Sequence, residues 1–152
     1  DTMGLTEAVR DAAVRGLPLW GTCAGAILLA AEVDGESAHM GLIDIAVRRN
    51  AFGSQLNSFV SAAAIPEVAS HPVPLVFIRA PQIVRAGPGV HVLLRQDGFI
   101  AAVCTDRILA TVFHPELTED LSFHRYFLHC CRRAAEFCGH SGTLRCSSGT
   151  AS

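Results

Sequence analysis

The sequence predicts an α/β fold, and three observations support that prediction. The beginning of the chain alternates between an amphipathic run, a short apolar run, a glycine-flanked turn and an alanine-rich run. The middle is rich in short strand-like runs separated by turn residues. A last apolar run then leads into a long segment of helical periodicity. Helices that alternate with strands in this way pack as layers around a sheet.

The first part of the chain contains a helix, a strand and a second helix. Residues 5–15 carry apolar side chains at helical spacing, and Gly16 follows as a helix stop. Residues 17–20 form an apolar run that predicts a buried strand. The glycine-rich residues 21–25 predict a tight turn, and the Ala-, Leu- and Ile-rich residues 26–32 predict the second helix.

Short strands dominate the rest of the chain up to a final helix. The candidate strands are residues 41–49, 55–64, 74–80, 91–96, 99–104 and 108–113. Asp97-Gly98, between two of these runs, is typical of a two-residue hairpin turn. Helical periodicity returns over residues 118–137, and the small, polar residues from Gly139 onward predict a disordered tail. We therefore expect one domain over residues 1–138 and a tail over 139–152.

Composition and charge argue against several classes of protein. Hydrophobic residues make up 50% of the 152 residues and charged residues 17%, which indicates a folded domain with its own core. The net charge is -2 and the basic residues are scattered, so we expect no nucleic-acid partner. The longest apolar run, residues 24–31, is far shorter than the roughly 20 residues that span a bilayer. The N-terminus lacks a signal-peptide pattern, and we expect a cytoplasmic protein without a membrane partner.

The cysteines predict reduced thiols rather than disulfides. They are Cys23, Cys104, Cys130, Cys131, Cys138 and Cys146. No C-x-x-C pair occurs, and a chain of this length without a secretion signal is expected to keep its thiols reduced. The Cys and His residues near the C-terminus match no common zinc spacing, so we expect no metal site.

A glycine-flanked cysteine is the first candidate for chemistry. Gly21-Thr22-Cys23-Ala24-Gly25 follows a predicted strand and precedes a predicted helix, which is the pattern of a nucleophile elbow with cysteine as the nucleophile. Gly21 and Gly25 would let the strand and the helix approach closely. The N-terminus of the helix is expected to lower the pKa of the thiol, and the Ala24 N–H is placed to stabilise an oxyanion. The alternative is a structural cysteine in a buried turn.

His114-Pro115-Glu116, at the end of another apolar run, is the second candidate. A thiol nucleophile needs a base that can also return a proton to the leaving amine, and an imidazole can do both near neutral pH. Glu116 lies two residues after His114, so its carboxylate can hold the imidazole as the third member of a triad. The alternative is an ordinary surface turn.

The two motifs together resemble those of the class I glutamine amidotransferases, which carry a cysteine elbow and a later H-x-E. A finer resemblance is to the glutaminase subunit of pyridoxal 5'-phosphate synthase, the PdxT/Pdx2 family. It is carried by WGTCAGAILLA (20–30), VRRNAFGSQLNSF (47–59), VFIRAP (76–81) and FHPELTED (113–120). Other class I amidotransferases share the elbow and the H-x-E but lack the second and third stretches. The resemblance implies a flavodoxin-like domain with a mixed sheet flanked by helices.

The resemblance also implies an activity and a set of site residues. The activity would be hydrolysis of L-glutamine to L-glutamate and ammonia for vitamin B6 biosynthesis, without a cofactor. The implied partner is the synthase subunit PdxS/Pdx1. The implied residues are Cys23, His114 and Glu116 for catalysis, Arg49, Ile78 and Arg79 for glutamine binding, and Ala24 for the oxyanion. An arginine suits the substrate carboxylate because its planar fork binds both oxygens; outside this motif context it indicates an ordinary ion pair.

One part of the family pattern has no match in this sequence. The family begins with a strand–helix–strand segment and a G-G-E-S loop that supplies an oxyanion-hole amide. We therefore expect an N-terminally incomplete domain that lacks its first strand and helix. Two other functions stay open, namely another class I amidotransferase that serves a different synthase, and a non-catalytic interaction module. A cysteine peptidase or an esterase-like hydrolase is disfavoured by the stretches 47–59 and 76–81.

Overall fold

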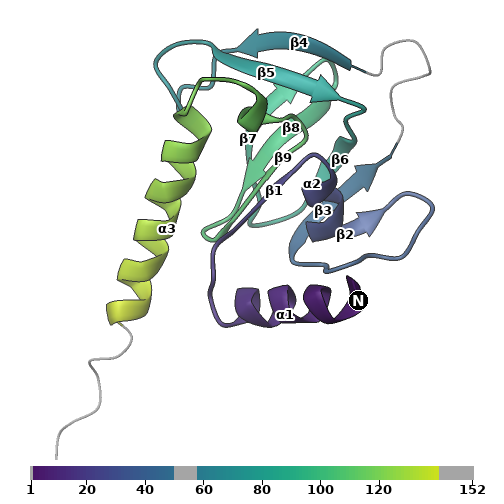
Figure 1. The fold of residues 1–152 in the computed structure, drawn as a ribbon, viewed down its shortest axis with the longest axis vertical. Helices are drawn as coiled ribbons and strands as arrows, with labels where there is room; N and C mark the ends of the chain where they lie inside the picture. The colour runs from purple at the N-terminus through teal and green to yellow at the C-terminus, as the bar shows by residue number, and fades with distance from the viewer. Residues whose placement is uncertain (1, 50–57, 141–152) are drawn as a thin grey trace, which may run out of the picture.

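The computed structural model describes residues 2–49 and 58–140, and it has the predicted α/β architecture, a curved mixed sheet flanked by helices (Figure 1). Its helices are α1 (Thr2–Val14), α2 (Ala24–Leu29) and α3 (Ser122–His140), with a 3-10 turn η1 (Pro115–Leu117). Its strands are β1 (Leu19–Thr22), β2 (Ala30–Val33), β3 (Ile43–Arg48), β4 (Ser58–Ala63), β5 (Val73–Ile78), β6 (Gln82–Ala86), β7 (His91–Gln96), β8 (Phe99–Cys104) and β9 (Ile108–Thr111). Within the described ranges, no helix has both the length and the apolar character needed to cross a bilayer.

The main sheet has the strand order β1-β9-β8-β6-β3-β2, with β7 paired to β8. β1 and β9 are parallel, and their last residues, Thr22 and Thr111, lie opposite each other. Because parallel strands end at the same edge of a sheet, the residues that follow β1 and β9 lie close together. A separate two-stranded sheet, β4-β5, lies above that edge in the view of Figure 1.

Three buried phenylalanines connect the segment after β9 to its surroundings. Phe113 packs edge-on against Phe77 of β5 and against Phe123 of α3, with ring centroids 5.8 Å and 5.2 Å apart. All three side chains are at most 1% exposed. Each buried ring removes a large apolar area from water and adds an edge-to-face contact. Phe113 therefore fixes the position of the residue that follows it, His114, between β5 and α3.

The hairpin prediction is confirmed, and the prediction of a helix over residues 26–32 is wrong in its second half. Asp97 and Gly98 both have positive φ values, 49° and 85°, and join the antiparallel strands β7 and β8. Helix α2 ends at Leu29, and residues 30–33 form strand β2, which pairs with β3. The carbonyl of Leu29 accepts a hydrogen bond from the N–H of Leu42, so pairing with the chain before β3 overrides the local helical preference.

Strand β6 and both ends of α3 also differ from the sequence prediction. Strand β6 was not predicted, because it is a five-residue run close to Pro81 on one side and to Pro88 on the other. Helix α3 begins at Ser122 rather than at residue 118, and it continues through Gly139 and His140, which the prediction assigned to the tail. The remainder of the predicted tail, residues 141–152, lies outside the described residues.

Asp120 determines where α3 begins. Its carboxylate accepts the backbone N–H of Ser122 at 2.8 Å and contacts Nε2 of His71 at 2.6 Å. Hydrogen bonds from Ser122 and His71 outweigh the effect of burial and lower the pKa of Asp120 to about 2. The carboxylate thus caps the helix and ties it to the loop before β5.

Replacing Asp120 with alanine is expected to lower the free energy of unfolding by about 1 kcal/mol, because the helix loses its cap. Asp120→Asn should lose less, since asparagine also caps helices. The pKa falls from about 4 in an unfolded chain to about 2 in the fold. The contribution of the Asp120 charge to the free energy of unfolding is therefore complete above pH 4, and it is lost as the pH falls toward 2. Urea unfolding of the three proteins between pH 7 and pH 3 measures both effects; equal stability of wild type and Asp120→Ala at pH 7 would contradict the capping role.

Candidate active site

Cys23 lies in the turn between β1 and α2, in a strained backbone conformation. Its φ is 49° and its ψ is -107°, a combination that side-chain-bearing residues rarely adopt. Its N–H donates to the carbonyl of Thr111 at 2.8 Å, and its own carbonyl accepts the N–H of Ala26 at 3.0 Å. The predicted sharp elbow at the cysteine is confirmed.

The two glycines of the motif differ in their surroundings. A Cβ on Gly21 would lie 2.6 Å from the carbonyl carbon and oxygen of Gly25 and 2.7 Å from Cδ1 of Leu29. A Cβ on Gly25 would meet no atom within 4 Å. The expectation that glycine permits the close approach of strand and helix is therefore confirmed for Gly21 and wrong for Gly25, whose backbone supplies the surface that Gly21 contacts.

These surroundings give opposite expectations for the same substitution. Gly21→Ala should lower the free energy of unfolding by about 3 kcal/mol, because the backbone of Gly25 cannot move aside without displacing α2. Gly25→Ala is the matched control, and it should leave stability unchanged or raise it by about 0.5–1 kcal/mol through a better helix propensity. Chemical denaturation of both variants measures the difference. Similar stability of the two variants would show that the contact between Gly21 and Gly25 is unimportant.

His114 and Glu116 form a bonded pair directly after β9. Nδ1 of His114 lies 2.6 Å from Oε1 of Glu116. The backbone N–H of His114 donates to the carbonyl of Val76 in β5 at 2.8 Å. The imidazole is mostly covered, with 21% of the side chain exposed, whereas the Glu116 side chain is 45% exposed. If the carboxylate accepts the proton on Nδ1, Nε2 is the nitrogen that can exchange a proton with another group.

Strand β5 connects the cysteine to this pair. Sγ of Cys23 lies 3.7 Å from the carbonyl oxygen of Ile78, and His114 is bonded to Val76, two residues earlier on the same strand. Residues two apart on a strand are separated by roughly 7 Å. The carboxylate of Glu116 is also close enough to act electrostatically on the Cys23 thiol. The structure thus brings the three predicted catalytic residues to one edge of the sheet.

The resting form of Cys23 differs from the expectation. Partial burial raises the pKa of the thiol, a hydrogen bond from the Ala24 N–H lowers it, and the negative charge of Glu116 raises it. The net direction is upward, so the expected lowering by the helix N-terminus is outweighed. The prediction failed because burial disfavours a thiolate more than a single N–H favours it. At neutral pH the group is a thiol, which must transfer its proton before it can attack.

The residues expected to bind substrate lie in two places. β5 ends at Ile78, beside Cys23, and the next residue, Arg79, has a φ of 47°, so the chain turns sharply there. Arg49 follows β3, and its Nε lies 2.9 Å from Oε1 of Glu36 in the connection between β2 and β3. The rest of the stretch that contains Arg49, residues 50–57, lies outside the described residues. Ile78 is thus next to the thiol, whereas Arg49 forms an ion pair with Glu36.

Sequence reasoning missed two residues beneath the elbow. Thr111, fully buried at the end of β9, accepts a hydrogen bond from the indole N–H of Trp20 at 3.2 Å. Thr111 also accepts a hydrogen bond from the Cys23 N–H, through its backbone carbonyl. A polar residue inside the apolar run 108–113 was the available signal, because a buried hydroxyl requires a partner.

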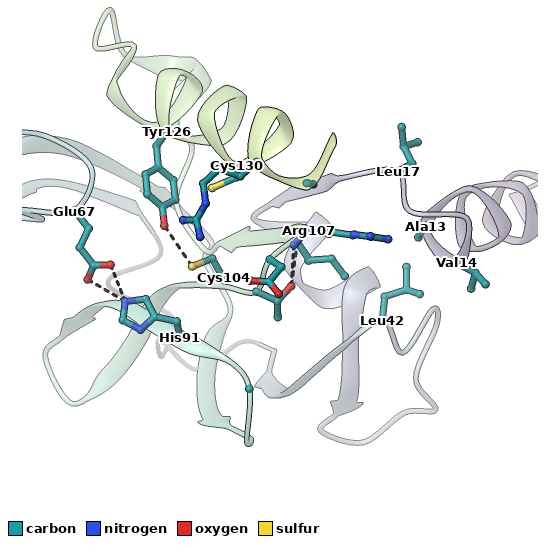
Figure 2. A pocket seen from close by; sticks show the side chains of 16 residues that line it. Ala13, Val14, Leu17, Leu42, Glu67, His91, Cys104, Arg107, Tyr126 and Cys130 are labelled. Carbon is teal, nitrogen blue, oxygen red and sulfur yellow. Dashed lines mark hydrogen bonds and ion pairs between the residues drawn. The ribbon is translucent and has the colours of Figure 1, made fainter. Parts of the chain in front are cut away.

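A cavity of about 700 Å³ lies at the opposite end of β8 and β9 from Cys23, between α1 and α3 (Figure 2). In it the Tyr126 hydroxyl lies 3.4 Å from Sγ of Cys104, and His91 contacts Glu67 at 2.8 Å. Burial raises the pKa of Cys104 and of Cys130, so both are protonated and poorly nucleophilic at neutral pH. Within the described ranges, no group of three or more His, Cys, Asp or Glu side chains is arranged to hold a metal ion. Burial raises the pKa of Cys23 as well, so protonation does not separate the two places. The difference lies in the backbone, because Cys104 and Cys130 lie in the regular elements β8 and α3 and Cys23 lies in a strained turn.

Comparison with known proteins gives consistent matches over most of the chain. Residues 1–133 match the SNO glutamine amidotransferase family. A relative from Syntrophus aciditrophicus, named pyridoxal 5'-phosphate synthase subunit PdxT, is 54% identical over 127 residues, which are 84% of this chain and 57% of the relative. A relative of the same name from Caldanaerobacter subterraneus subsp. tengcongensis is 52% identical over 126 residues, 82% of this chain and 67% of the relative. The chain thus spans between 57% and 67% of the length of these two relatives.

A solved structure has the same fold. A crystal structure described as a glutamine amidotransferase superimposes with a TM-score of 0.78 at 43% sequence identity. The match covers 85% of this chain and 69% of that chain. The mixed sheet flanked by helices is therefore a known architecture.

Proposed function

Because this chain belongs to the SNO glutamine amidotransferase family, we propose that it is the glutaminase subunit of a pyridoxal 5'-phosphate synthase. The reaction is hydrolysis of L-glutamine to L-glutamate and ammonia, in the cytoplasm, for use by the synthase subunit PdxS/Pdx1. The names of relatives with 52–54% identity support the choice of synthase. The observation that carries the proposal is the strained Cys23 beside a strand that leads into the bonded pair His114–Glu116.

In the first half-reaction, Cys23 attacks the side-chain amide of glutamine. Its thiol proton passes to Nε2 of His114, and the sulfur forms a bond to the amide carbon. The tetrahedral intermediate collapses when His114 returns the proton to the nitrogen, so that ammonia leaves and a glutamyl thioester remains. Since the pKa of Cys23 is raised in the free protein, a base is required for this step.

In the second half-reaction, water hydrolyses the thioester. His114 takes a proton from water as the oxygen attacks the thioester carbon, and the proton then returns to the sulfur as glutamate leaves. Glu116, 2.6 Å from Nδ1, holds the imidazole in the tautomer that leaves Nε2 available and stabilises the imidazolium formed in each half-reaction. Neither half-reaction needs a metal ion or an organic cofactor, because sulfur and imidazole supply the nucleophile and the acid–base group.

Four other residues supply binding and charge stabilisation. The Ala24 N–H bonds the Cys23 sulfur in the free protein. During the reaction it donates to the oxyanion that forms on the amide oxygen. Glutamine is bound by Ile78, whose carbonyl oxygen lies 3.7 Å from Sγ of Cys23, and by Arg79, at the turn that follows β5. Arg49 binds the glutamine carboxylate through its guanidinium fork, exchanging its carboxylate partner Glu36 for the substrate.

The test is release of glutamate from glutamine by the complete protein, measured alone and with the purified synthase subunit. We expect turnover with the synthase subunit, and ammonia transfer into its product. Turnover that responds to a different synthase instead would assign the chain to another amidotransferase. Stable complex formation without any glutamate release would replace the enzyme with an interaction module.

A further inference from the structure

The segment Trp20–Cys23 is bonded at both of its ends to a single residue, Thr111. At one end the Trp20 indole N–H donates to the Thr111 hydroxyl at 3.2 Å. At the other end the Cys23 backbone N–H donates to the Thr111 carbonyl at 2.8 Å. Between them, Thr22 lies opposite Thr111 in the parallel pairing of β1 and β9. The chain that leads to the nucleophile is thus held at two points by one residue of the neighbouring strand.

A hydroxyl at this position is unusual for its surroundings. Thr111 is 0% exposed, and its neighbours Leu109, Ala110, Val112 and Phe113 are buried and apolar. A buried hydroxyl without a partner costs free energy, and here the partner comes from the strand that carries the cysteine. A valine would fill the same volume without this cost, so packing alone does not explain the threonine.

Trp20 extends the connection to helix α3. Its ring lies 5.0 Å from the ring of His124, in an edge-on arrangement, and 5.6 Å from that of Phe127. The indole therefore fixes the distance between the helix and the end of β1. Thr111 also lies three residues before His114. This one residue therefore connects the nucleophile through its backbone carbonyl, helix α3 through its hydroxyl and Trp20, and the base through the chain.

We propose that Thr111 is a positioning residue, whose hydroxyl bond to Trp20 keeps the strained Cys23 turn in register with His114. The inference rests on the proposed glutaminase function. The positive φ of Cys23 persists only if surrounding contacts fix it, and the two bonds to Thr111 are such contacts. Loss of the hydroxyl bond would let the turn relax, which moves the thiol relative to the imidazole while the side chains that bind glutamine keep their places.

The test compares Thr111→Val with Thr111→Ser in the complete protein, with the synthase subunit present. We expect Thr111→Val to lower kcat about tenfold, because a small misplacement of the reacting groups slows the reaction. KM for glutamine should change less than about twofold, because the residues that bind glutamine are unchanged. Thr111→Ser retains the hydroxyl and should restore kcat to within about threefold of wild type. Thr105→Val is the matched control, since the Thr105 hydroxyl bonds the N–H of Ile108 at the other end of β9. It should leave kcat unchanged.

Trp20→Phe removes the same bond from its other side while keeping an aromatic ring against α3. If the bond is the cause, this variant shows the same loss of kcat, and combining it with Thr111→Val adds no further loss. Additive losses, or a Thr111→Val enzyme with the kcat of Thr105→Val, would overturn the proposal. The thermal midpoints of all variants are measured, and Trp20→Phe and Thr111→Ser decide the matter if Thr111→Val does not fold.

A second readout does not depend on turnover. The rate at which iodoacetamide alkylates Cys23, followed by mass spectrometry of its peptide, reports the environment of the sulfur. We expect Thr111→Val to change the alkylation rate at pH 8 at least about threefold, in either direction, because a displaced sulfur changes both its burial and its bond to the Ala24 N–H, which act on the thiol pKa in opposite senses. An unchanged rate would overturn the positioning role. If the wild-type protein releases no glutamate but the two proteins still differ in alkylation rate, the glutaminase function is refuted and the positioning role of Thr111 is retained.

Discussion

Replacing Cys23 with alanine is expected to lower glutamate release by about 10⁴-fold or more, because no other group can form the thioester. The loss should lie in kcat, while the complex with the synthase subunit still forms. An alanine would have to adopt the φ of 49° that the cysteine has, at a similar cost, and it would retain the N–H that donates to the Thr111 carbonyl. The fold should therefore change little.

The measurement is glutamate release at saturating glutamine, together with analytical sedimentation of the complex. Cys131→Ala is the control, since Cys131 is a half-buried thiol on α3, away from the elbow, and we expect it to retain full activity. Activity near the wild-type level in Cys23→Ala would remove the thiol from the mechanism.

Replacing His114 with asparagine is expected to lower kcat by about 10³-fold, within the range that positioned acid–base groups contribute. The thiol is protonated at neutral pH, because burial raises the pKa of Cys23. Without a base, little thiolate forms, and the leaving nitrogen receives no proton. Asparagine is smaller than histidine and can still bond Glu116, and the backbone bond to Val76 does not involve the side chain. The variant should therefore fold.

The matched control for this substitution is His91→Asn. His91 also forms a bonded pair with a glutamate, Glu67, at 2.8 Å, but it lies at the cavity on the opposite side of the domain. The same chemical change is thus made in a similar pair outside the elbow, and we expect turnover to stay within about twofold of wild type. If His114→Asn and His91→Asn have equal activity, another base serves Cys23. Partial recovery of His114→Asn at pH 9 to 10 is expected, because hydroxide then replaces the missing base.

Much of the candidate site could be predicted from local patterns. Cys23 between glycines and His114-x-Glu116 at a strand end are short-range signals, because each depends on a turn or a strand end set by neighbouring residues. The stretches that contain Arg49 and Arg79 indicated the family, because they too are short runs of residue types at fixed spacing. The hairpin at Asp97-Gly98 needed no tertiary information, since two positive φ values are required wherever such a turn occurs.

Other features depend on contacts between distant residues and were therefore not predicted. Residues 30–32 belong to the predicted helix and instead become part of strand β2, because β3 offers hydrogen bonds along its length. Strand β6 is short and lies between β3 and β8 in the sheet, so its order comes from its neighbours. The direction of the Cys23 pKa follows from burial, which the sequence of the turn does not contain.

The sequence by itself determined the α/β class, the family, and which thiol and imidazole are candidates for catalysis, because these depend on residue type and short spacing. Only the tertiary structure decided that β1 and β9 are parallel neighbours and that Thr111 bonds both ends of the segment before the elbow. Those features follow from strand pairing and from burial. Both depend on which distant segments meet when the apolar faces of the chain leave water.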